Sequence, residues 1–204
     1  MKVELERTFP IPGAADIAWA FLQDIPGVAT CMPGAKITER IDDQHYKGTV
    51  TVKVGPASMS FRGEIEVVDL DAGRRMLHLL AKGADTTGTS GASMDLVARI
   101  EAGATEGTSS LVGRSEVTMS GKAAAFGGRM MGTVADQILK QFAGSFASQV
   151  VARAEAAAST ADKSVAVTPA DGEINAPVEE LNALGLFWAV VRDWLRGLFR
   201  RKAA

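Results

Sequence analysis

Six short segments that alternate apolar and polar residues follow one another between residues 35 and 121, and this regularity constrains the fold more than any other feature. In the segment HYKGTVTVKVG, residues 45–55, one face would carry Tyr46 and three valines, and the other face would carry lysines and threonines. Turns rich in glycine, such as TTGTSG and AGATEG, separate the segments. Short strands at regular spacing with such turns predict an antiparallel meander. Because one face of this sheet is apolar, another element must cover it.

The expected strands of the meander are residues 35–42, 45–55, 57–71, 74–85, 91–102 and 108–121. A further alternating segment, residues 2–9, opens the chain, with Val3, Leu5 and Arg7 on one face. Between that strand and the meander, residues 12–24 and 25–35 predict two short helices, because the first has helical spacing and the second holds its helical residues between two Pro-Gly steps.

The cover for the apolar face is a proline-free stretch from about residue 122 to residue 157. Apolar residues recur in it every three or four positions, which predicts a long amphipathic helix. These residues are Met131, Val134, Ile138, Phe142, Phe146 and Val150. The first part, GKAAAFGGRMMG, is rich in glycine, and a glycine costs about 1 kcal/mol relative to alanine inside a helix. The glycines therefore mark a close approach or spare room beside the helix, or else a frayed helix start.

The composition narrows the class of protein. The formal net charge of −2 gives no sign of a nucleic-acid binder. The single cysteine, Cys31, excludes an intramolecular disulfide, and with only His45 and His78 beside it we expect no metal site. The N-terminal sequence MKVELERTF has the pattern of a strand and not of a signal peptide, so we expect a cytoplasmic protein.

Catalytic residues are not expected. The chain has no Gly-x-Ser-x-Gly element, no P-loop and no cluster of histidines and carboxylates. We interpret Cys31 as a small buried residue in preference to a reactive thiol or metal ligand. His78 fits a half-buried strand position, and Asp24 fits a capping or bracing role in the short helices. An enzyme, such as a cyclase or hydrolase, would lack a visible acid–base pair.

The C-terminal quarter of the chain has a different composition. Residues 158–180 have no periodicity and no aromatic residue, and alanine, serine, threonine, proline and acidic residues dominate. This composition predicts a disordered linker. Three parts are therefore expected: a domain of residues 1–157, a linker of residues 158–180 and a closing helix of residues 181–204.

The closing stretch LFWAVVRDWLRGLFRRK predicts an amphipathic helix. On a helical wheel its apolar side chains share one arc, and Arg192, Asp193, Arg196 and Arg200 lie opposite. Its longest apolar run has nine residues, Ala183 to Val191, whereas a transmembrane helix needs about 20. The apolar residues of the arc are Leu184, Phe187, Trp188, Val191, Trp194, Leu195, Leu198 and Phe199.

Such a helix is typical of segments that lie in the membrane interface. Each basic residue near the surface adds about 1 kcal/mol of attraction to anionic lipid, and the basic cluster is Arg196, Arg200, Arg201 and Lys202. We therefore expect a peripheral location on the inner face of the cytoplasmic membrane. Two alternatives remain: the helix docks into a groove of a partner, or it folds back onto its own domain.

Several stretches of residues 1–155 resemble the family of the G subunit of carbon monoxide dehydrogenase. The stretches are ERTFPIPGAADIAWAFLQD, TCMPGA, YKGTVTVKVGPASMSFRGEIEV and GGRMMGTVADQILKQF. The residues that match the family's signature are Trp19, Leu22, Asp24, Cys31, Pro33 and Gly34. One departure is that the proline after Asp24 comes one residue late, at Pro26.

The resemblance implies an α+β helix-grip, or START-like, fold of the SRPBCC superfamily. In this fold a curved antiparallel sheet wraps around a long C-terminal helix and leaves a hydrophobic cavity. The apolar residues expected to face inward are rich in methionine, which suits a hydrophobic, flexible ligand. The alternative for each of these residues is that it belongs to an ordinary packed core and contacts no ligand. The expected cavity residues are Met59, Phe61, Leu77, Leu79, Met94, Leu96, Val117, Met119, Gly128, Met130, Met131, Val134 and Phe142.

The resemblance also implies that the protein associates with a molybdenum-containing carbon monoxide dehydrogenase or a related molybdenum hydroxylase. We expect a membrane-tethered accessory protein that recruits the dehydrogenase to the membrane. It would carry a respiratory quinone, menaquinone, as a bound ligand for electron transfer, with no covalent cofactor and no catalysis of its own. The alternative is an assembly factor for the metal centre of the dehydrogenase.

Overall fold

The computed structural model describes residues 1–54, 57–126 and 128–164. The residues expected to form the membrane-surface helix, 181–204, and most of the expected linker lie outside this part. The elements are β1 (Lys2–Ile11), α1 (Ala15–Leu22), α2 (Ile25–Cys31), β2 (Ala35–Arg40), β3 (His45–Val54), β4 (Ala57–Asp71), β5 (Met76–Asp85), β6 (Ser90–Ala102), β7 (Ser109–Gly121), the 3-10 helix η1 (Lys122–Phe126) and α3 (Gly128–Ser164).

The strands form one antiparallel sheet in the order β1-β7-β6-β5-β4-β3-β2. The meander from β2 to β7 keeps chain order, and β1 pairs with β7 along its whole length, from Lys2 opposite Thr118 to Ile11 opposite Ser109. This arrangement confirms the predicted fold, a first strand followed by a six-stranded meander. The sheet register also confirms the predicted faces, because inward Tyr46 pairs with Ile65, and Val50 pairs with Phe61.

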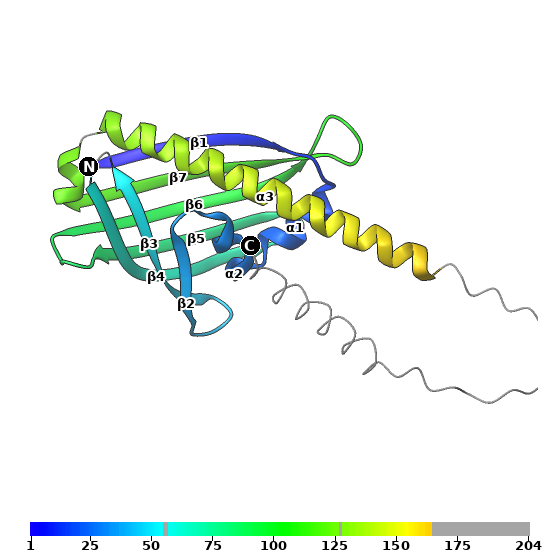
Figure 1. Cartoon of the computed structure of the whole chain (residues 1–204), viewed down its shortest axis with the longest axis horizontal. Coiled ribbons are helices and arrows are strands. Elements are labelled where there is room, and N and C mark those ends of the chain that lie inside the picture. The colour runs from blue at the N-terminus through cyan, green and yellow to red at the C-terminus, as the bar shows by residue number, and fades with distance from the viewer. Residues whose placement is uncertain (55–56, 127, 165–204) are drawn as a thin grey trace, which may run out of the picture. The chain divides into compact units, whose positions relative to one another are not determined.

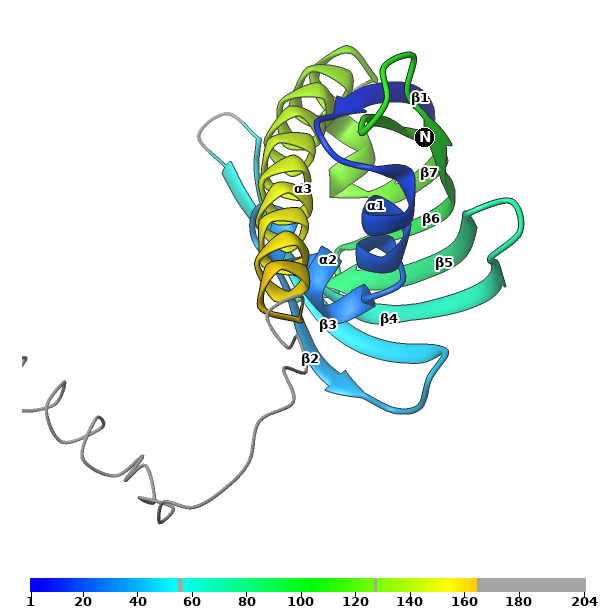
Figure 2. The ribbon, with the colours of Figure 1, turned by 90° about the vertical axis from the view of Figure 1, so that its right-hand side faces the viewer.

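The sheet curls strongly around its concave face (Figure 2). One cross-strand row that faces inward consists of small residues, namely Gly48, Gly63, Gly83 and Ala92. A Cβ on Gly63 would collide with the carbonyl oxygen of Lys82 on the neighbouring strand. Only glycine lets the two backbones approach this closely.

The long helix α3 runs across the concave side of the sheet (Figures 1 and 2), as the sequence predicted. Its main contacts are with β1 and β3 and with the two short helices α1 and α2. The short helices lie on the concave side as well, where α1 contacts β6 and β7. Helix α3 thus closes the open side of the curled sheet, which is the helix-grip arrangement.

Two predicted boundaries are wrong. The long helix begins at Gly128, after a separate 3-10 turn over Lys122–Phe126, and not near residue 122. It ends at Ser164, so residues 158–164 are helical and do not belong to the predicted linker. The early break follows from the poor helix propensity of the glycines there. The late end follows from the alanine-rich sequence after residue 154, which contains no proline before Pro169.

Candidate ligand-binding site

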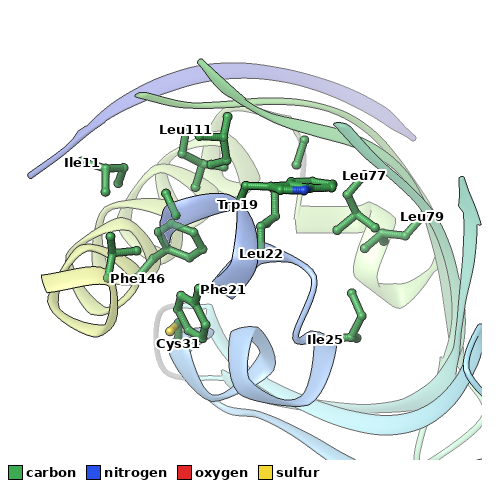
Figure 3. Packing of buried hydrophobic residues seen from close by; sticks show 14 of the residues in the cluster. Ile11, Trp19, Phe21, Leu22, Ile25, Cys31, Leu77, Leu79, Leu111 and Phe146 are labelled. Carbon is green, nitrogen blue, oxygen red and sulfur yellow. The ribbon is translucent and has the colours of Figure 1, made fainter. Parts of the chain in front are cut away.

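The concave face of the sheet is packed tightly where the short helices cover it. Phe21 of α1 stacks on Phe146 of α3, with ring centroids 5.0 Å apart. Figure 3 shows Trp19 lying between Leu111 of β7 and Leu77 of β5, directly under the sheet. All five side chains are at least nine-tenths buried. At the far ends of β6 and β7, η1 forms a second cover, and the backbone N–H of Ala123 donates to the Ser90 hydroxyl at 3.1 Å.

Between these two covers, the apolar side chains of the concave face are only half-buried. We call this set the inner wall. Its members are Val3, Leu5, Val50, Val52, Phe61, Ile65, Met94, Leu96 and Val117. They come from β1, β3, β4, β6 and β7, and their in-register pairing places them on one surface. Helix α3 faces them with half-buried Val134, Ile138 and Phe142. The wall is therefore apolar surface that the fold encloses only in part.

The predicted cavity residues divide into three groups. Leu77, Leu79 and Met119 are buried, with 1%, 9% and 7% of their surface exposed, and Leu77 and Leu79 belong to the packed core. Gly128 is the first residue of α3, and the side chains of Met130 and Met131 lie outside the described part of the chain. The remaining residues are half-buried on the concave side, namely Met59, Phe61, Met94, Leu96, Val117, Val134 and Phe142.

Open space lies beside Gly113, which faces inward on β7. Its row of the sheet runs from Arg7 of β1 through Gly113 to Ala98 of β6 and Leu77 of β5. A Cβ built on Gly113 would meet no atom within 4 Å. The same is true of Gly132 on α3, apart from its own helix. A packed protein interior leaves few such voids, so the inward side of Gly113 is open space beside the inner wall.

An ion pair joins the edge of the sheet to α3 beside this space. Arg7 of β1 donates from Nε and Nη2 to one carboxylate oxygen of Asp136, at 3.1 and 2.6 Å. The two side chains keep 43% and 45% of their surface exposed. Solvent therefore weakens the pair, which is worth at most about 1 kcal/mol. The pair links α3 to β1, in addition to the packing contacts between them.

The residues that match the family signature support the short helices and the turn after them. Trp19, Leu22 and Cys31 are buried, and Pro33 is half-buried. Asp24 is the N-cap of α2 and accepts a hydrogen bond from the backbone N–H of Gly27 at 3.0 Å. Gly34 has a φ of 78°, in the left-handed region that favours glycine, and a Cβ there would collide with the carbonyl oxygen of Thr51. These residues thus form the frame of the site.

Both histidines contact a carboxylate outside the inner wall. His78 contacts Asp95 at 2.9 Å on the outer face of the sheet, and His45 contacts Asp42 in a turn. Burial raises the pKa of the Cys31 thiol, which is 3% exposed. Among the described residues, no group of three or more His, Cys, Asp or Glu side chains is placed to hold a metal ion. No helix of the described part is both long and apolar enough to cross a bilayer.

A hollow lies on the outer face of the sheet and has a volume of about 820 Å³. Charged and hydroxyl side chains surround it, namely Lys47, Arg62, Glu64, Lys82, Ser93 and Thr118. Apolar ligands bind where the lining is mostly hydrophobic. The half-buried inner wall, whose side chains are all apolar, is therefore a better candidate site for an apolar ligand than this hollow with four charged side chains around it.

Comparison with known families identifies the chain's relatives. The model of a family described as the G subunit of carbon monoxide dehydrogenase (CoxG) matches residues 8–151, from β1 to α3. The chain belongs to the CoxG family. The matched span contains all six signature residues and nearly all of the CoxG inner wall. No curated protein matches the chain.

Solved structures show that the CoxG fold is shared more widely. A conserved protein from Geobacillus kaustophilus has 21% identity and a TM-score of 0.65, over 73% of this chain and 95% of the other. An aromatase/cyclase from Streptomyces sp. R1128 has 18% identity and a TM-score of 0.55, over 77% and 98%. A START superfamily protein from Mycobacterium smegmatis has 14% identity and a TM-score of 0.51, over 72% and 96%. At these identities the likeness concerns the fold alone, and it confirms the START-like helix-grip fold.

The sequence prediction omits two residues that the structure places on the concave face. Gly113 and Ser115 both face inward on β7, two residues apart. The signal was present, because they occupy the same alternating positions as Val117 and Met119. Their small size and polarity concealed them in a search for apolar residues. Trp19 was predicted only as a signature residue, and it lies under the same sheet.

Proposed function

We propose that this CoxG protein is an accessory protein of a molybdenum-containing carbon monoxide dehydrogenase or related hydroxylase, and that it binds a respiratory quinone, menaquinone, on its inner wall. The family supports the association with the dehydrogenase. The observation that carries the ligand proposal is the half-buried inner wall beside the open space at Gly113. Apolar surface that a fold leaves uncovered on its concave side gains free energy when a ligand covers it, at about 25 cal/mol per Å².

The shape and chemistry of the inner wall favour a flat, apolar ligand with a long tail. Its side chains are aliphatic or methionine with one phenylalanine, and methionine adapts to varied shapes. The concave face provides two distinct environments, a packed end under α1 and an open stretch along the strands. A quinone ring would lie near Gly113, and the isoprenoid tail would lie along the strands towards Val50 and Phe61.

Tethering to the membrane is the second part of the proposal. It depends on the amphipathic pattern of residues 181–204, in which Trp188 and Trp194 share a face opposite the arginines. The peptide between Ser164 and this segment would let the domain reach both the bilayer and the dehydrogenase. The protein would then collect quinone at the inner face of the cytoplasmic membrane and present it to its partner, which performs the redox chemistry.

The test is to recover the ligand from the full-length protein. The chain is incubated with vesicles that contain menaquinone, separated from them and extracted with organic solvent, and quinone and metals are quantified by mass spectrometry. We expect close to one menaquinone per chain and no stoichiometric metal. Stoichiometric molybdenum or copper without quinone would overturn the proposal in favour of an assembly factor. Turnover of an added cyclic substrate would favour an enzyme instead.

A further inference from the structure

We infer that Trp19 and Ser115 are the residues that hold the polar head of the ligand, through the indole N–H and the hydroxyl. The inference rests on the proposed function and deepens it, because it states which end of the ligand lies under α1. It assigns the ligand a specific chemistry: a flat ring that carries an oxygen able to accept a hydrogen bond.

The indole N–H of Trp19 is a donor without a protein acceptor in the described part of the chain. Trp19 is 93% buried, with 7% of its surface exposed. No side-chain nitrogen or oxygen of the described residues is both fully buried and unpaired. Nε1 makes no hydrogen bond to these residues and is not a fully buried unpaired atom, so we assign the small exposed part of Trp19 to it. The N–H therefore opens into accessible space although the ring is packed.

The position of Trp19 shows which space this is. Helix α1 contacts β6 and β7 from the concave side, and the indole ring lies between Leu111 and Leu77 (Figure 3). Leu77 is in the same cross-strand row as Gly113, where a Cβ would meet nothing within 4 Å. The indole thus lies over the row of the sheet that has the open space.

Ser115 supplies the second polar group from the sheet itself. It faces inward in the next row, between Leu5 of β1 and Leu96 of β6. Its hydroxyl also makes no hydrogen bond to the described residues and is not fully buried. Adjacent inward rows of a strand are about 7 Å apart. Two unpaired polar groups therefore flank one open space, which the Arg7–Asp136 ion pair borders at the edge of the sheet.

This arrangement is the usual form of a small-molecule site, in which apolar walls bury the ligand and a few polar groups fix its orientation. An indole N–H can only donate, so its partner must be an acceptor. A quinone carbonyl oxygen is such an acceptor, whereas a hydrocarbon has none. The two residues would consequently discriminate a quinone from an isoprenoid hydrocarbon of similar length. A bound hydrocarbon would displace the solvent that accepts a hydrogen bond from each polar group and would offer no acceptor in its place, which lowers its affinity.

The experiment compares two probes on the full-length protein and its variants. One probe is menaquinone, and the other is squalene, which has an isoprenoid chain and no oxygen. The variants are Trp19→Phe, which keeps an aromatic ring without the N–H, and Ser115→Ala. Ser110→Ala, on the outer face of the same strand, is the matched control. Dissociation constants are measured by partition from vesicles with chromatographic detection, and thermal unfolding checks that each variant is folded.

We expect each of the two variants to lower the ratio of menaquinone to squalene affinity about fivefold, the loss of one hydrogen bond, while the control leaves it unchanged. Any loss that comes only from the smaller ring would lower both affinities and leave the ratio as it was. An unchanged ratio in folded Trp19→Phe and Ser115→Ala would overturn the inference. If the wild type binds neither probe, the proposed function itself fails, which is a distinct result.

Discussion

Single residues decide how much of the concave face remains free. Leu77 and Met94 both face inward on neighbouring strands, yet Leu77 is 1% exposed and Met94 is half-buried. The difference arises because α1 covers the row of Leu77, whereas Met94 lies farther along its strand. Gly113 adds to the free space because it has no side chain to occupy it.

Filling the space at Gly113 should block the ligand without harming the fold. We expect Gly113→Leu to weaken menaquinone binding by roughly tenfold or more. The reason is that the leucine would occupy the space of the ligand, and overpacking of this kind costs about 1–3 kcal/mol. The free energy of unfolding should change by less than about 1 kcal/mol, since the new Cβ meets nothing and glycine is a poor strand residue. Gly144→Leu is the control. Gly144 is an exposed residue of α3, and a Cβ built on it also meets no atom of another element within 4 Å. Equal quinone binding by both folded variants would place the ligand elsewhere.

Asp24 stabilises the frame of the site through its cap of α2. We expect Asp24→Ala to lower the free energy of unfolding by about 1 kcal/mol, the usual cost of a lost N-cap. Asp24→Asn should cost less than half as much, because asparagine caps equally well and only the 3.6 Å pair with Arg153 is lost. Urea unfolding of the three proteins measures both values. If Asp24→Asn lowers the free energy of unfolding as much as Asp24→Ala does, the charge of Asp24, and not its cap of α2, is the source of the stabilisation.

At the scale of elements, the strands were predictable and the degree of burial was not. Alternation with period two identifies which side of each strand faces inward, and the register confirms it from Tyr46 to Val117. Periodicity contains no information about what lies opposite, so Leu77 and Met94 look alike in the sequence. The start of α3 was missed for a related reason, because glycines lower helix propensity without fixing where a 3-10 turn gives way to an α-helix.

The Arg7–Asp136 pair is a polar link between β1 and α3, and its strength can be measured. A double-mutant cycle with Arg7→Gln and Asp136→Asn should give a coupling free energy of about 0.2–1 kcal/mol, because both side chains are nearly half exposed. The coupling should decrease in 1 M salt, where charges are screened within about 3 Å. The Lys2–Glu116 pair, at 2.7 Å within the sheet, serves as the control.

Faster release of menaquinone is expected from the Arg7 and Asp136 variants and not from variants of the control pair, because only the first pair connects the helix to the sheet. Release into excess empty vesicles measures this rate. Identical release rates for the two pairs would show that the position of α3 does not control access to the inner wall.

In the whole molecule, we propose that ligand binding and membrane binding belong to different parts of the chain. The helix-grip domain holds the inner wall, and residues 181–204 carry the predicted interfacial pattern. We expect a chain without residues 181–204 to stay folded, to keep its menaquinone affinity and to lose co-sedimentation with anionic vesicles. Equal sedimentation of the truncated and full-length chains would contradict the anchor. Loss of unfolding cooperativity would instead indicate that the segment packs on the domain.

Fluorescence can test whether a quinone lies on the inner wall next to Trp19. The chain has three tryptophans, so a full-length variant with Trp188→Phe and Trp194→Phe leaves Trp19 as its only indole. Quinone rings quench a tryptophan that they contact. We expect saturable quenching of Trp19 by menaquinone at one ligand per chain, and little change with squalene. Quenching no stronger than that of free N-acetyltryptophanamide, in a folded protein that retains bound menaquinone, would contradict it.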